Sequence, residues 1–307
     1  MPPSPSDTGP VVVLSGGTGG AKLARGMLDV VAPGALTVIA NPGDDIEMYG
    51  AYVAPDADLV TFWLADRIDA RGWGLDGDTF AVMDGLRELG VDVWFNLGDR
   101  DLAIGLQRAQ ALAEGERLTR AHAAIVDALD VSARVLPASD HPVRTRVMTA
   151  GRWLGFQEYM IQAQGPVEDV AFHGVRTARP TPEVLEALAG ARAIVIGPSN
   201  PVASIGPILE LPGLRAALRD SPAPVVAVSP LVGGQVLKGP TAEFMRHAGH
   251  PLSADGIAAY YDGLIDGLVA DEDTARVPGL QTGVLMDTPD ARRDLAAQTL
   301  RFALALV

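Results

Sequence analysis

Residues 11–27 read VVVLSGGTGGAKLARGM, and this stretch decides the fold of the chain. Three valines and a leucine form a short apolar run that glycines end, which is typical of a buried strand. Leu23 and Met27 follow at helical spacing. Four of the five residues 16–20 are glycines, so backbone N–H groups are bare at the positive end of the helix dipole. The sequence therefore predicts a strand, a glycine loop and a helix that together bind a phosphate group.

A glycine loop between a strand and a helix can also be only a tight packing corner, and this alternative stays open. The two standard nucleotide templates do not fit. A dinucleotide fingerprint needs a third glycine at the position of Lys22, after Gly17 and Gly19. A Walker loop needs Gly-Lys-Ser/Thr, whereas Ala21 and Leu23 flank the lysine. The loop therefore favours neither an ordinary NAD enzyme nor an ordinary ATPase.

The composition excludes several classes of protein. With 307 residues and 48% hydrophobic content, the chain can bury a large core. A net charge of −14 disfavours a nucleic-acid partner, and the absence of cysteine excludes disulfides, thiolate catalysis and cysteine-ligated metal. No apolar run is long enough to span a membrane, and residues 1–10 lack the pattern of a signal peptide. We expect a cytoplasmic protein with a disordered lead-in over residues 1–10.

Four further apolar runs have the length of buried strands, and each ends in a loop of small or acidic residues. These runs are Leu36–Ala40, Val91–Phe95, Ala193–Ile196 and Pro224–Val228. A strand, a helix and a second strand within about thirty residues form a βαβ unit, which implies a parallel sheet. Ligands of such sheets bind outside the carboxyl ends of the strands. The loops that follow the five strands therefore predict one nucleotide-type site.

The middle of the chain predicts a second, smaller layer. Residues 60–130 are mostly helical in pattern, and residues 133–176 change character. Apolar residues alternate over residues 143–161 as in antiparallel strands or a hairpin. We therefore expect a helical and antiparallel β cap formed from roughly 60–178.

The last third of the chain completes the expected sheet and its cover. An apolar segment covers residues 257–268, a strand is expected over Thr282–Met286, and a helix over Asp290–Leu304. The fold class is therefore α/β, with a Rossmann-like, mostly parallel sheet and helices on both faces. Residues 11–307 form a single domain that includes the cap.

Two pairs of carboxylates lie near the glycine loop in the expected fold. Asp44 and Asp45 follow the second strand, and Asp56 and Asp58 precede an apolar helical run. Mg²⁺ binds a few carboxylates together with phosphate oxygens, which favours a metal site. Aspartate is also common in turns and at helix N-caps, so a structural role stays open. The five histidines lack zinc-ligand spacing and are expected at the surface or at caps.

Nine segments spread over nearly the whole chain carry a resemblance to a known family. They are SGGTGGAKL (15–23), NPGDD (41–45), PDAD (55–58), RGWG (71–74), LGDRD (97–101), LPASDHPVRT (136–145), FQEY (156–159), GPSNPVASIGPI (197–208) and SPLVGG (229–234). In content and order they resemble the 2-phospho-L-lactate transferase family of deazaflavin coenzyme (coenzyme F-420) biosynthesis. Bacterial members of that family are also called phosphoenolpyruvate transferases.

The resemblance implies a Rossmann-like homodimer that acts as a transferase. Its donor is a guanosine diphospho-activated three-carbon acid, and its acceptor is the deazaflavin 7,8-didemethyl-8-hydroxy-5-deazariboflavin. A ribityl hydroxyl of the deazaflavin attacks the phosphorus that bears the acid, and GMP leaves. Mg²⁺ is the implied cofactor, whereas the deazaflavin is a substrate. Neither a nucleic acid nor a membrane is an expected partner.

The resemblance also implies roles for individual residues. Phosphate and nucleotide contacts are expected from Gly16, Gly17, Thr18, Gly19, Gly20, Lys22, Gly197, Ser199, Asn200 and Ser204. Backbone amides are expected to contribute more than the lysine. The residues expected to be catalytic and to hold Mg²⁺ are Asp44, Asp45 and Asp58, the last being the candidate base. Contacts to the deazaflavin are expected from Asp58, Asn96, Asp99 and Arg100.

Three positions depart from the family pattern. Asn96 lacks the basic charge of some members, Leu59 replaces a frequent threonine, and Thr241 replaces a frequent alanine.

The sequence does not decide which three-carbon acid is transferred. Lactate, enolpyruvate and glycerate all stay open, because no residue can be assigned to distinguishing them. An alternative of another class is a nucleotide-sugar-binding regulatory protein of the gluconeogenesis-factor type, which has a related fold and a similar glycine loop. The segments LGDRD and GPSNPVASIGPI favour the transferase.

Overall fold

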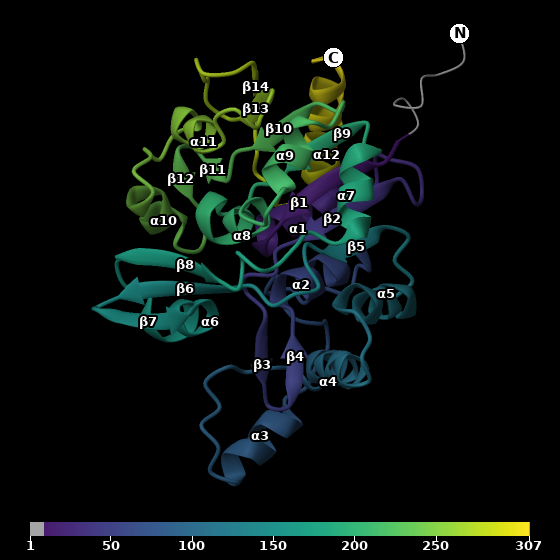
Figure 1. Cartoon of the computed structure of the whole chain (residues 1–307), viewed down its shortest axis with the longest axis vertical. Coiled ribbons are helices and arrows are strands. Elements are labelled where there is room, and N and C mark those ends of the chain that lie inside the picture. Colours follow the sequence, from purple (N-terminus) through teal and green to yellow (C-terminus); the bar gives the residue numbers. More distant parts are fainter. Residues whose placement is uncertain (1–8, 307) are drawn as a thin grey trace.

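A seven-stranded parallel sheet forms the centre of the computed structural model, which describes residues 9–306 (Figure 1). Its strands are β1 (Val11–Ser15), β2 (Leu36–Ala40), β5 (Arg134–Pro137), β9 (Ala193–Ile196), β10 (Val225–Val228), β13 (Gly267–Ala270) and β14 (Gly279–Gln281). They lie in the order β14-β13-β10-β9-β1-β2-β5, and each neighbouring pair is parallel. The predicted α/β class is confirmed. Of the expected lead-in, residues 1–8 lie outside the described residues.

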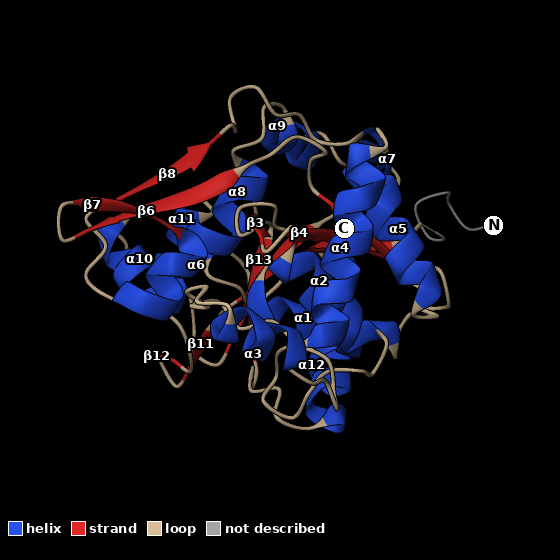
Figure 2. Cartoon of the chain, turned by 90° about the horizontal axis from the view of Figure 1, so that it is seen from below, coloured by secondary structure: helices blue, strands red, loops and turns tan. Residues whose placement is uncertain are grey.

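Helices cover both faces of this sheet, as the sequence predicts (Figure 2). One face packs on α1 (Gly17–Leu28), α2 (Pro55–Leu64), α5 (Leu118–Ala128) and α12 (Pro289–Leu304). The other face packs on α7 (Pro182–Ala189), α8 (Gly206–Leu209), α9 (Leu214–Arg219) and α11 (Ala254–Tyr260). Side chains alternate along a strand, so Val11 and Val13 enter the first core while Val12 and Leu14 enter the second. Burial on both faces explains why β1 reads as one continuous apolar run.

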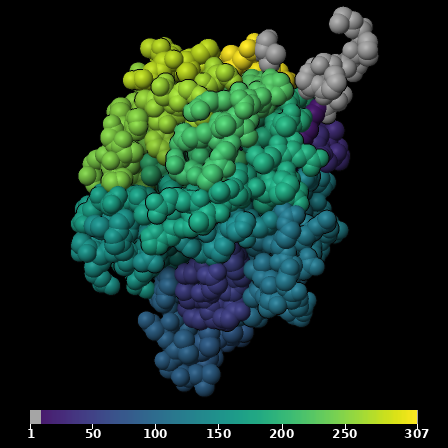
Figure 3. Space-filling model, in the orientation of Figure 1, coloured from purple at the N-terminus to yellow at the C-terminus, as the bar shows by residue number. Residues whose placement is uncertain are grey.

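An arm projects from one end of the molecule, at the bottom of Figures 1 and 3. It consists of residues 46–53 and 66–113, which hold the hairpin of β3 (Ile46–Met48) and β4 (Ala51–Val53), then α3 (Ala81–Glu88) and α4 (Asp99–Ala113). The arm has a small core of its own, which includes Met83, Leu97 and Leu102. It is therefore a packed unit attached to the main domain.

A three-stranded antiparallel sheet forms a second peripheral layer (Figure 2). It pairs β6 (Arg144–Thr149) with β7 (Arg152–Gly155) on one side and β8 (Asp169–His173) on the other. The predicted antiparallel layer is therefore present. Residues 156–161, expected to continue the alternation, are helical instead, in α6 (Phe156–Glu158) and the π-helical η2 (Tyr159–Ala163). Tyr159 turns inward there and is buried against Phe244 of α10 (Thr241–His247).

Two strand predictions are wrong. Val91–Phe95 is irregular, because it lies in the arm where no strand pairs with it, and Val93 and Phe95 pack on the arm core instead. Thr282–Met286 follows β14 as irregular chain, although Val284 and Met286 are buried as a strand residue would be. Apolar side chains thus occur at both places without the strand pairing that would make the backbone a strand.

Two boundaries also change. The apolar segment 257–268 contains the end of α11 and the start of β13, since an apolar run does not reveal where a helix gives way to a strand. The range 60–178 expected as a cap contains β5, which is an edge strand of the main sheet. Within residues 9–306, no helix is long and apolar enough to cross a membrane.

The packing of α1 on α12 gives a test of the fold. A Cβ on Gly26 of α1 would lie 2.3 Å from the Arg292 carbonyl oxygen, so we expect Gly26→Ala to lower the free energy of unfolding by about 2 kcal/mol or more. Gly85 of α3 has open space around its Cβ position, so Gly85→Ala should raise stability by about 0.5–1 kcal/mol. Urea denaturation measures both, and equal effects of the two substitutions would contradict the packing.

Candidate functional site

A cavity of about 1020 Å³ lies outside the carboxyl ends of the parallel strands. Its wall is formed by the glycine loop, the start of α2, the arm, η2 and the loops after β9 and β10. The expected site residues that line it are Gly16, Gly17, Thr18, Gly19, Lys22, Asp44, Asp58, Asn96, Ser199, Asn200 and Ser204. Those that do not line it are Gly20, Asp45, Asp99, Arg100 and Gly197. The loops after separate strands thus meet at one hollow.

The first turn of α1 presents two backbone N–H groups to this cavity. The N–H of Gly17 donates to Oδ1 of Asp56 at 2.5 Å. Among the described residues, no protein group accepts a hydrogen bond from the N–H of Thr18 or Gly19. The first turn contains no acidic residue of its own, and its N-cap residue Gly16 has no side chain to cap it. An anion would therefore meet two free amides at the positive end of the helix dipole.

The glycines are also required by packing against the loop after β9. A Cβ on Gly19 would lie 2.0 Å from the Pro198 carbonyl oxygen. A Cβ on Gly20 would lie 2.7 Å from the Ser199 hydroxyl, which also accepts a hydrogen bond from the N–H of Gly16 at 3.2 Å. The packing interpretation of the loop is therefore confirmed, and the same close packing holds the free amides at the cavity, while phosphate binding stays a prediction.

Asn200 holds the second loop in place. Its Oδ1 accepts hydrogen bonds from the N–H groups of Val202 and Ala203 at 3.0 and 3.1 Å, at the start of the π-helical segment η3 (Pro201–Ile205). The Nδ2 atom of Asn200 is buried and has no hydrogen-bond partner among the described residues. A buried amide needs an acceptor, and a ligand in the cavity can supply one.

Asp44 and Asp56 share a single donor beside the glycine loop. Nδ2 of Asn41 donates to both carboxylates, at 3.0 and 2.8 Å respectively. Burial and the charge of Asp56 raise the pKa of Asp44 well above its usual value, although Asn41 opposes the shift. Burial likewise raises the pKa of Asp56 to about 6. Two buried carboxylates that share one amide favour a cation between them and the cavity.

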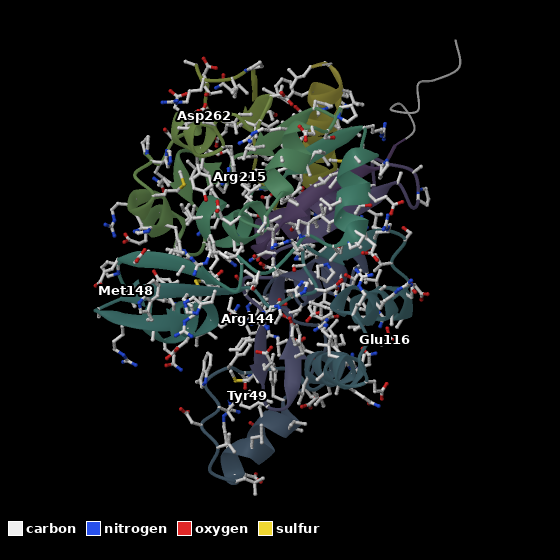
Figure 4. All side chains as sticks on the ribbon, viewed as in Figure 1. Tyr49, Glu116, Arg144, Met148, Arg215 and Asp262 are labelled. Atoms are coloured by element: carbon white, nitrogen blue, oxygen red, sulfur yellow. The ribbon has the colours of Figure 1, made fainter. Side chains whose placement is uncertain are left out.

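Asp45 is engaged outside the cavity. The hydroxyl of Tyr52 donates to its Oδ2 at 2.8 Å, and burial raises the pKa of Asp45 to about 7. The guanidinium of Arg144 lies 5.4 Å from the Tyr52 ring and donates to Glu47 at 2.7 Å, at the base of the hairpin (Figure 4). Asp45 therefore helps to anchor β3 and β4 to the main domain.

Asp58 forms a buried ion pair with Arg108 of α4. Both terminal nitrogens of the guanidinium donate to the carboxylate, Nη1 to Oδ2 at 3.1 Å and Nη2 to Oδ1. Nη1 also donates to the carbonyl oxygen of Tyr52 at 2.9 Å. Unlike Asp44, Asp58 therefore has a compensating positive charge next to it.

His122 of α5 lies behind this pair and is fully buried, so its expected place at the surface or at a cap is wrong. Its Nδ1 is 3.3 Å from Nη2 of Arg108, and its Nε2 is 3.1 Å from the hydroxyl of Thr61. Burial and, secondarily, the charge of Arg108 hold the pKa of His122 well below its usual value. The imidazole is therefore neutral.

The three expected metal ligands thus have three different environments. Asp44 faces Asp56, Asp45 is bonded to Tyr52, and Asp58 is paired with arginine. Within the part of the chain that the structure describes, no three Asp, Glu or His side chains are grouped so that they could hold a metal ion by themselves. Asp44 and Asp56 form the pair whose charge is least compensated.

Aromatic rings of the arm form the opposite end of the cavity. Trp73, Phe80, Trp94 and Phe95 all line it. Arg71 lies over two of these rings, with its guanidinium carbon 4.3 Å from the centroid of Trp73 and 5.8 Å from that of Phe80. Flat apolar walls of this kind suit a planar ring system.

The deazaflavin contacts expected on the arm, Asn96, Asp99 and Arg100, do not all line the cavity. Asn96 lines the cavity, and its Oδ1 accepts a hydrogen bond from Arg87 at 2.7 Å. The carboxylate of Asp99 is occupied by the N–H groups of the first two residues of α3, at 3.0 Å each. Arg100 is exposed. Because Asp99 caps a helix, only Asn96 of these three residues reaches the cavity.

Lys22 contributes a positive edge beside the glycine loop. Its Nζ lies 5.7 Å from the ring of Trp63, and the guanidinium of Arg292 lies 5.1 Å from the same ring. Burial, then the charges of Arg292 and Lys238, lower the pKa of Lys22. Lys22 and Lys238 both line the cavity, so positive charge gathers on the side where the free amides lie.

Comparison with known proteins identifies the family. Residues 11–298 match the family described as 2-phospho-L-lactate transferase CofD. The chain belongs to the CofD family. It is therefore a transferase, as the resemblance implies.

Curated relatives of the CofD family cover most of the chain. It is 38% identical to a 2-phospho-L-lactate transferase of Methanosarcina mazei, over 85% of this chain and 87% of that protein. It is 41% identical to a phosphoenolpyruvate transferase of Kitasatospora aureofaciens, over 85% of this chain and 84% of that one. A phosphoenolpyruvate transferase of Thermobifida fusca is 37% identical over 96% of this chain and 98% of its own length.

Solved structures support the fold of this CofD family member. A crystal structure of BH3568, a UPF0052 family protein of Bacillus halodurans, matches with a TM-score of 0.62 and 18% identity. The match covers 95% of this chain and 99% of that one. A second crystal structure of BH3568 matches with a TM-score of 0.58. At this level of identity the likeness concerns the fold alone.

Several residues of the CofD site escaped the sequence analysis. Asn41 appeared there only as part of the NPGDD segment, Asp56 only as one of a pair of carboxylates, and Arg108 not at all. Asp101 also lines the cavity, and burial, with the charges of Asp58 and Asp78, raises its pKa to about 7. The available signal was a polar residue at a core position, as for Arg108 on the buried side of α4.

The neutral state of His122 gives a test by pH. A histidine whose pKa is lowered by folding loses stability as the pH falls below its unfolded pKa of about 6.5. Asparagine does not titrate in this range. As the pH is lowered from 6.5 to 5.5, we therefore expect the free energy of unfolding of the wild type to fall relative to that of His122→Asn by up to about 1.4 kcal/mol. Urea denaturation of both proteins at the two pH values measures it. A difference that does not change with pH would contradict a neutral buried imidazole.

Proposed function

We propose that this chain is a transferase of coenzyme F-420 biosynthesis. It moves a phospho-three-carbon-acid group from a guanosine diphospho-activated donor to 7,8-didemethyl-8-hydroxy-5-deazariboflavin and releases GMP. The observation that carries the proposal is one cavity with free helix amides and lysines at one end and aromatic rings at the other. A diphosphate suits the first end, and a flat deazaflavin suits the second. The names of the curated relatives support the same reaction class.

The diphosphate of the donor binds at the start of α1. The N–H groups of Thr18 and Gly19 donate to its oxygens, and Lys22 supplies a positive charge nearby. Ser199, Asn200 and Ser204 face the guanosine, with the unpartnered Nδ2 of Asn200 available to an acceptor atom. The deazaflavin lies between Trp73 and the other rings of the arm. Gly20 and Gly197 act by packing, outside the cavity.

Mg²⁺ fits this site at Asp44 and Asp56. The ion commonly uses one or two carboxylates together with substrate phosphate oxygens, which agrees with two buried carboxylates beside the free amides. An ion held by these two carboxylates would supply positive charge to the diphosphate oxygens. Asp45 and Asp58, expected as ligands from sequence, are already compensated by Tyr52 and Arg108.

The reaction requires positioning more than proton transfer. The ribityl hydroxyl oxygen forms a bond to the phosphorus that bears the acid, and the bridging P–O bond to the guanosine phosphate breaks. GMP leaves with the electron pair of that bond, and the hydroxyl proton is released to water. The free amides and Lys22 stabilise the charge on the leaving phosphate. Asp58 lines the cavity as an acceptor for the attacking hydroxyl.

The assignment is tested with the guanylylated donors, the deazaflavin and Mg²⁺. We expect the wild type to form product and release GMP, and mass spectrometry of the product from each donor identifies the acid. Asp44→Asn and Asp56→Asn should each lower kcat at least about 100-fold, since charge neutralisation at phosphorus is lost. Asp140→Asn is the control, because Asp140 pairs with Arg117 outside the cavity. Wild-type turnover in both cavity variants would contradict the metal assignment.

Calorimetry separates this proposal from the regulatory alternative. A transferase should bind the deazaflavin, with the heat lost in Trp73→Ala because a stacking ring is removed. Binding of a UDP-sugar without binding of the deazaflavin would favour a nucleotide-sugar-binding regulator. A homodimer and a cytoplasmic location, which the sequence led us to expect, remain predictions.

A further inference from the structure

A fully buried arginine and histidine lie directly behind the cavity and have no role in the reaction described above. Arg108 belongs to α4 and His122 to α5, and both side chains have no exposed surface. Neither residue lines the cavity, whereas their neighbour Asp58 does. Burying a guanidinium costs several kcal/mol and demands compensation, so its position is a specific feature of the fold.

We propose that Arg108 is a positioning residue that fixes the Asp58 carboxylate for the acceptor hydroxyl, and that His122 positions Arg108 in turn. The inference rests on the proposed function, since it concerns how that reaction orients its nucleophile. In this proposal Asp58 acts as a fixed hydrogen-bond acceptor, and Asp44 and Asp56 hold the cation.

The hydrogen bonds of Asp58 leave one acceptor position free. A carboxylate offers about four acceptor positions, two on each oxygen. Oδ2 accepts from Nη1 of Arg108 at 3.1 Å and from the N–H of Ala54 at 3.3 Å, while Oδ1 accepts from Nη2 of Arg108. The remaining position is on Oδ1. Asp58 lines the cavity, so a hydroxyl bound there would supply the missing donor.

The partners of His122 fix its tautomer. A guanidinium can only donate, so Nη2 of Arg108 donates to Nδ1 of His122, and the proton of the ring must be on Nε2. That N–H donates to the hydroxyl of Thr61, which donates in turn to the carbonyl oxygen of Ala57 at 2.8 Å. Within this chain of hydrogen bonds each donor has an acceptor, although Nε of Arg108, which lies outside the chain, has no hydrogen-bond partner among the described residues. The chain therefore holds the Arg108 guanidinium in a single orientation.

A role in stability alone makes a different prediction from a role in positioning. Arg108 also donates to the carbonyl oxygen of Tyr52, which ties α4 to β4. If that were its only purpose, a variant that stays folded would keep its turnover. If the arginine positions Asp58, a folded variant with a displaced carboxylate loses kcat while its donor binding is unchanged.

Arg108→Lys is the direct test, because it keeps the charge and loses the fork that holds both carboxylate oxygens. We expect kcat to fall by about 100-fold, as for other displaced catalytic geometries, with KM for the donor within about two-fold of wild type. Arg117→Lys is the matched control: Arg117 also holds a carboxylate through two nitrogens, that of Glu183, but it is exposed and outside the cavity. Its kcat should be that of the wild type. A folded Arg108→Lys protein with wild-type kcat would overturn the proposal.

A second pair of variants applies even if Arg108→Lys does not fold. His122→Asn places an amide oxygen near the position of Nδ1, so the variant can still accept a hydrogen bond from Arg108. His122→Ala cannot accept this hydrogen bond. We expect His122→Asn to keep at least about ten-fold more kcat than His122→Ala at equal folded fraction. Equal kcat in the two variants would overturn the role of His122.

Nitrogen NMR of the wild type provides a readout independent of activity. The ring of His122 should show a protonated Nε2 and an unprotonated Nδ1. The opposite tautomer would overturn the proposed chain of donors. If the wild type transfers no group at all, the proposed function fails and this inference with it. If it does transfer and Arg108→Lys is as active, the inference alone fails.

Discussion

The close contact between the glycine loop and the loop after β9 is the constraint on which the site depends. Gly19 meets the Pro198 carbonyl and Gly20 meets the Ser199 hydroxyl at distances that leave no room for a Cβ. Adjacent parallel strands bring these loops together, because β9 pairs directly with β1. The free amides of α1 are therefore held by backbone packing, so this part of the cavity wall is formed by the protein alone.

The charges of the site divide into two groups with different physical roles. Asp58 and Arg108 compensate each other within the protein. Asp44 and Asp56 are buried, share the amide of Asn41 and have pKa values raised by burial. A buried charge is tolerated when it is paired. The protein thus carries a carboxylate paired with an arginine next to two carboxylates that have no such cation beside them.

The sequence predicted the centre of the fold well and its arm poorly, for a physical reason. Strands buried on both faces, such as β1 and β9, can be recognised in the sequence as continuous apolar runs. The parallel topology then predicts that the loops after these strands lie at the same edge of the sheet. Val91–Phe95 has the same apolar character, but its side chains pack on the arm core without a strand partner. A local apolar pattern indicates that side chains pack on a core, but it does not indicate whether the backbone pairs with another strand. For the same reason Arg108, the single charged residue between 102 and 113, gave no sign of its partner Asp58, which is fifty residues away.

The two helices of the arm cap each other. Asp99, the first residue of α4, accepts the amides that begin α3, while Asp78, just before α3, accepts the amides of Arg100 and Asp101 at the start of α4. Neither helix can fray at its start without releasing a carboxylate that the other needs. The starts of α3 and α4 are therefore tied to each other within the arm. Its residues would exchange amide hydrogens together, as a single cooperative unit separate from the parallel sheet.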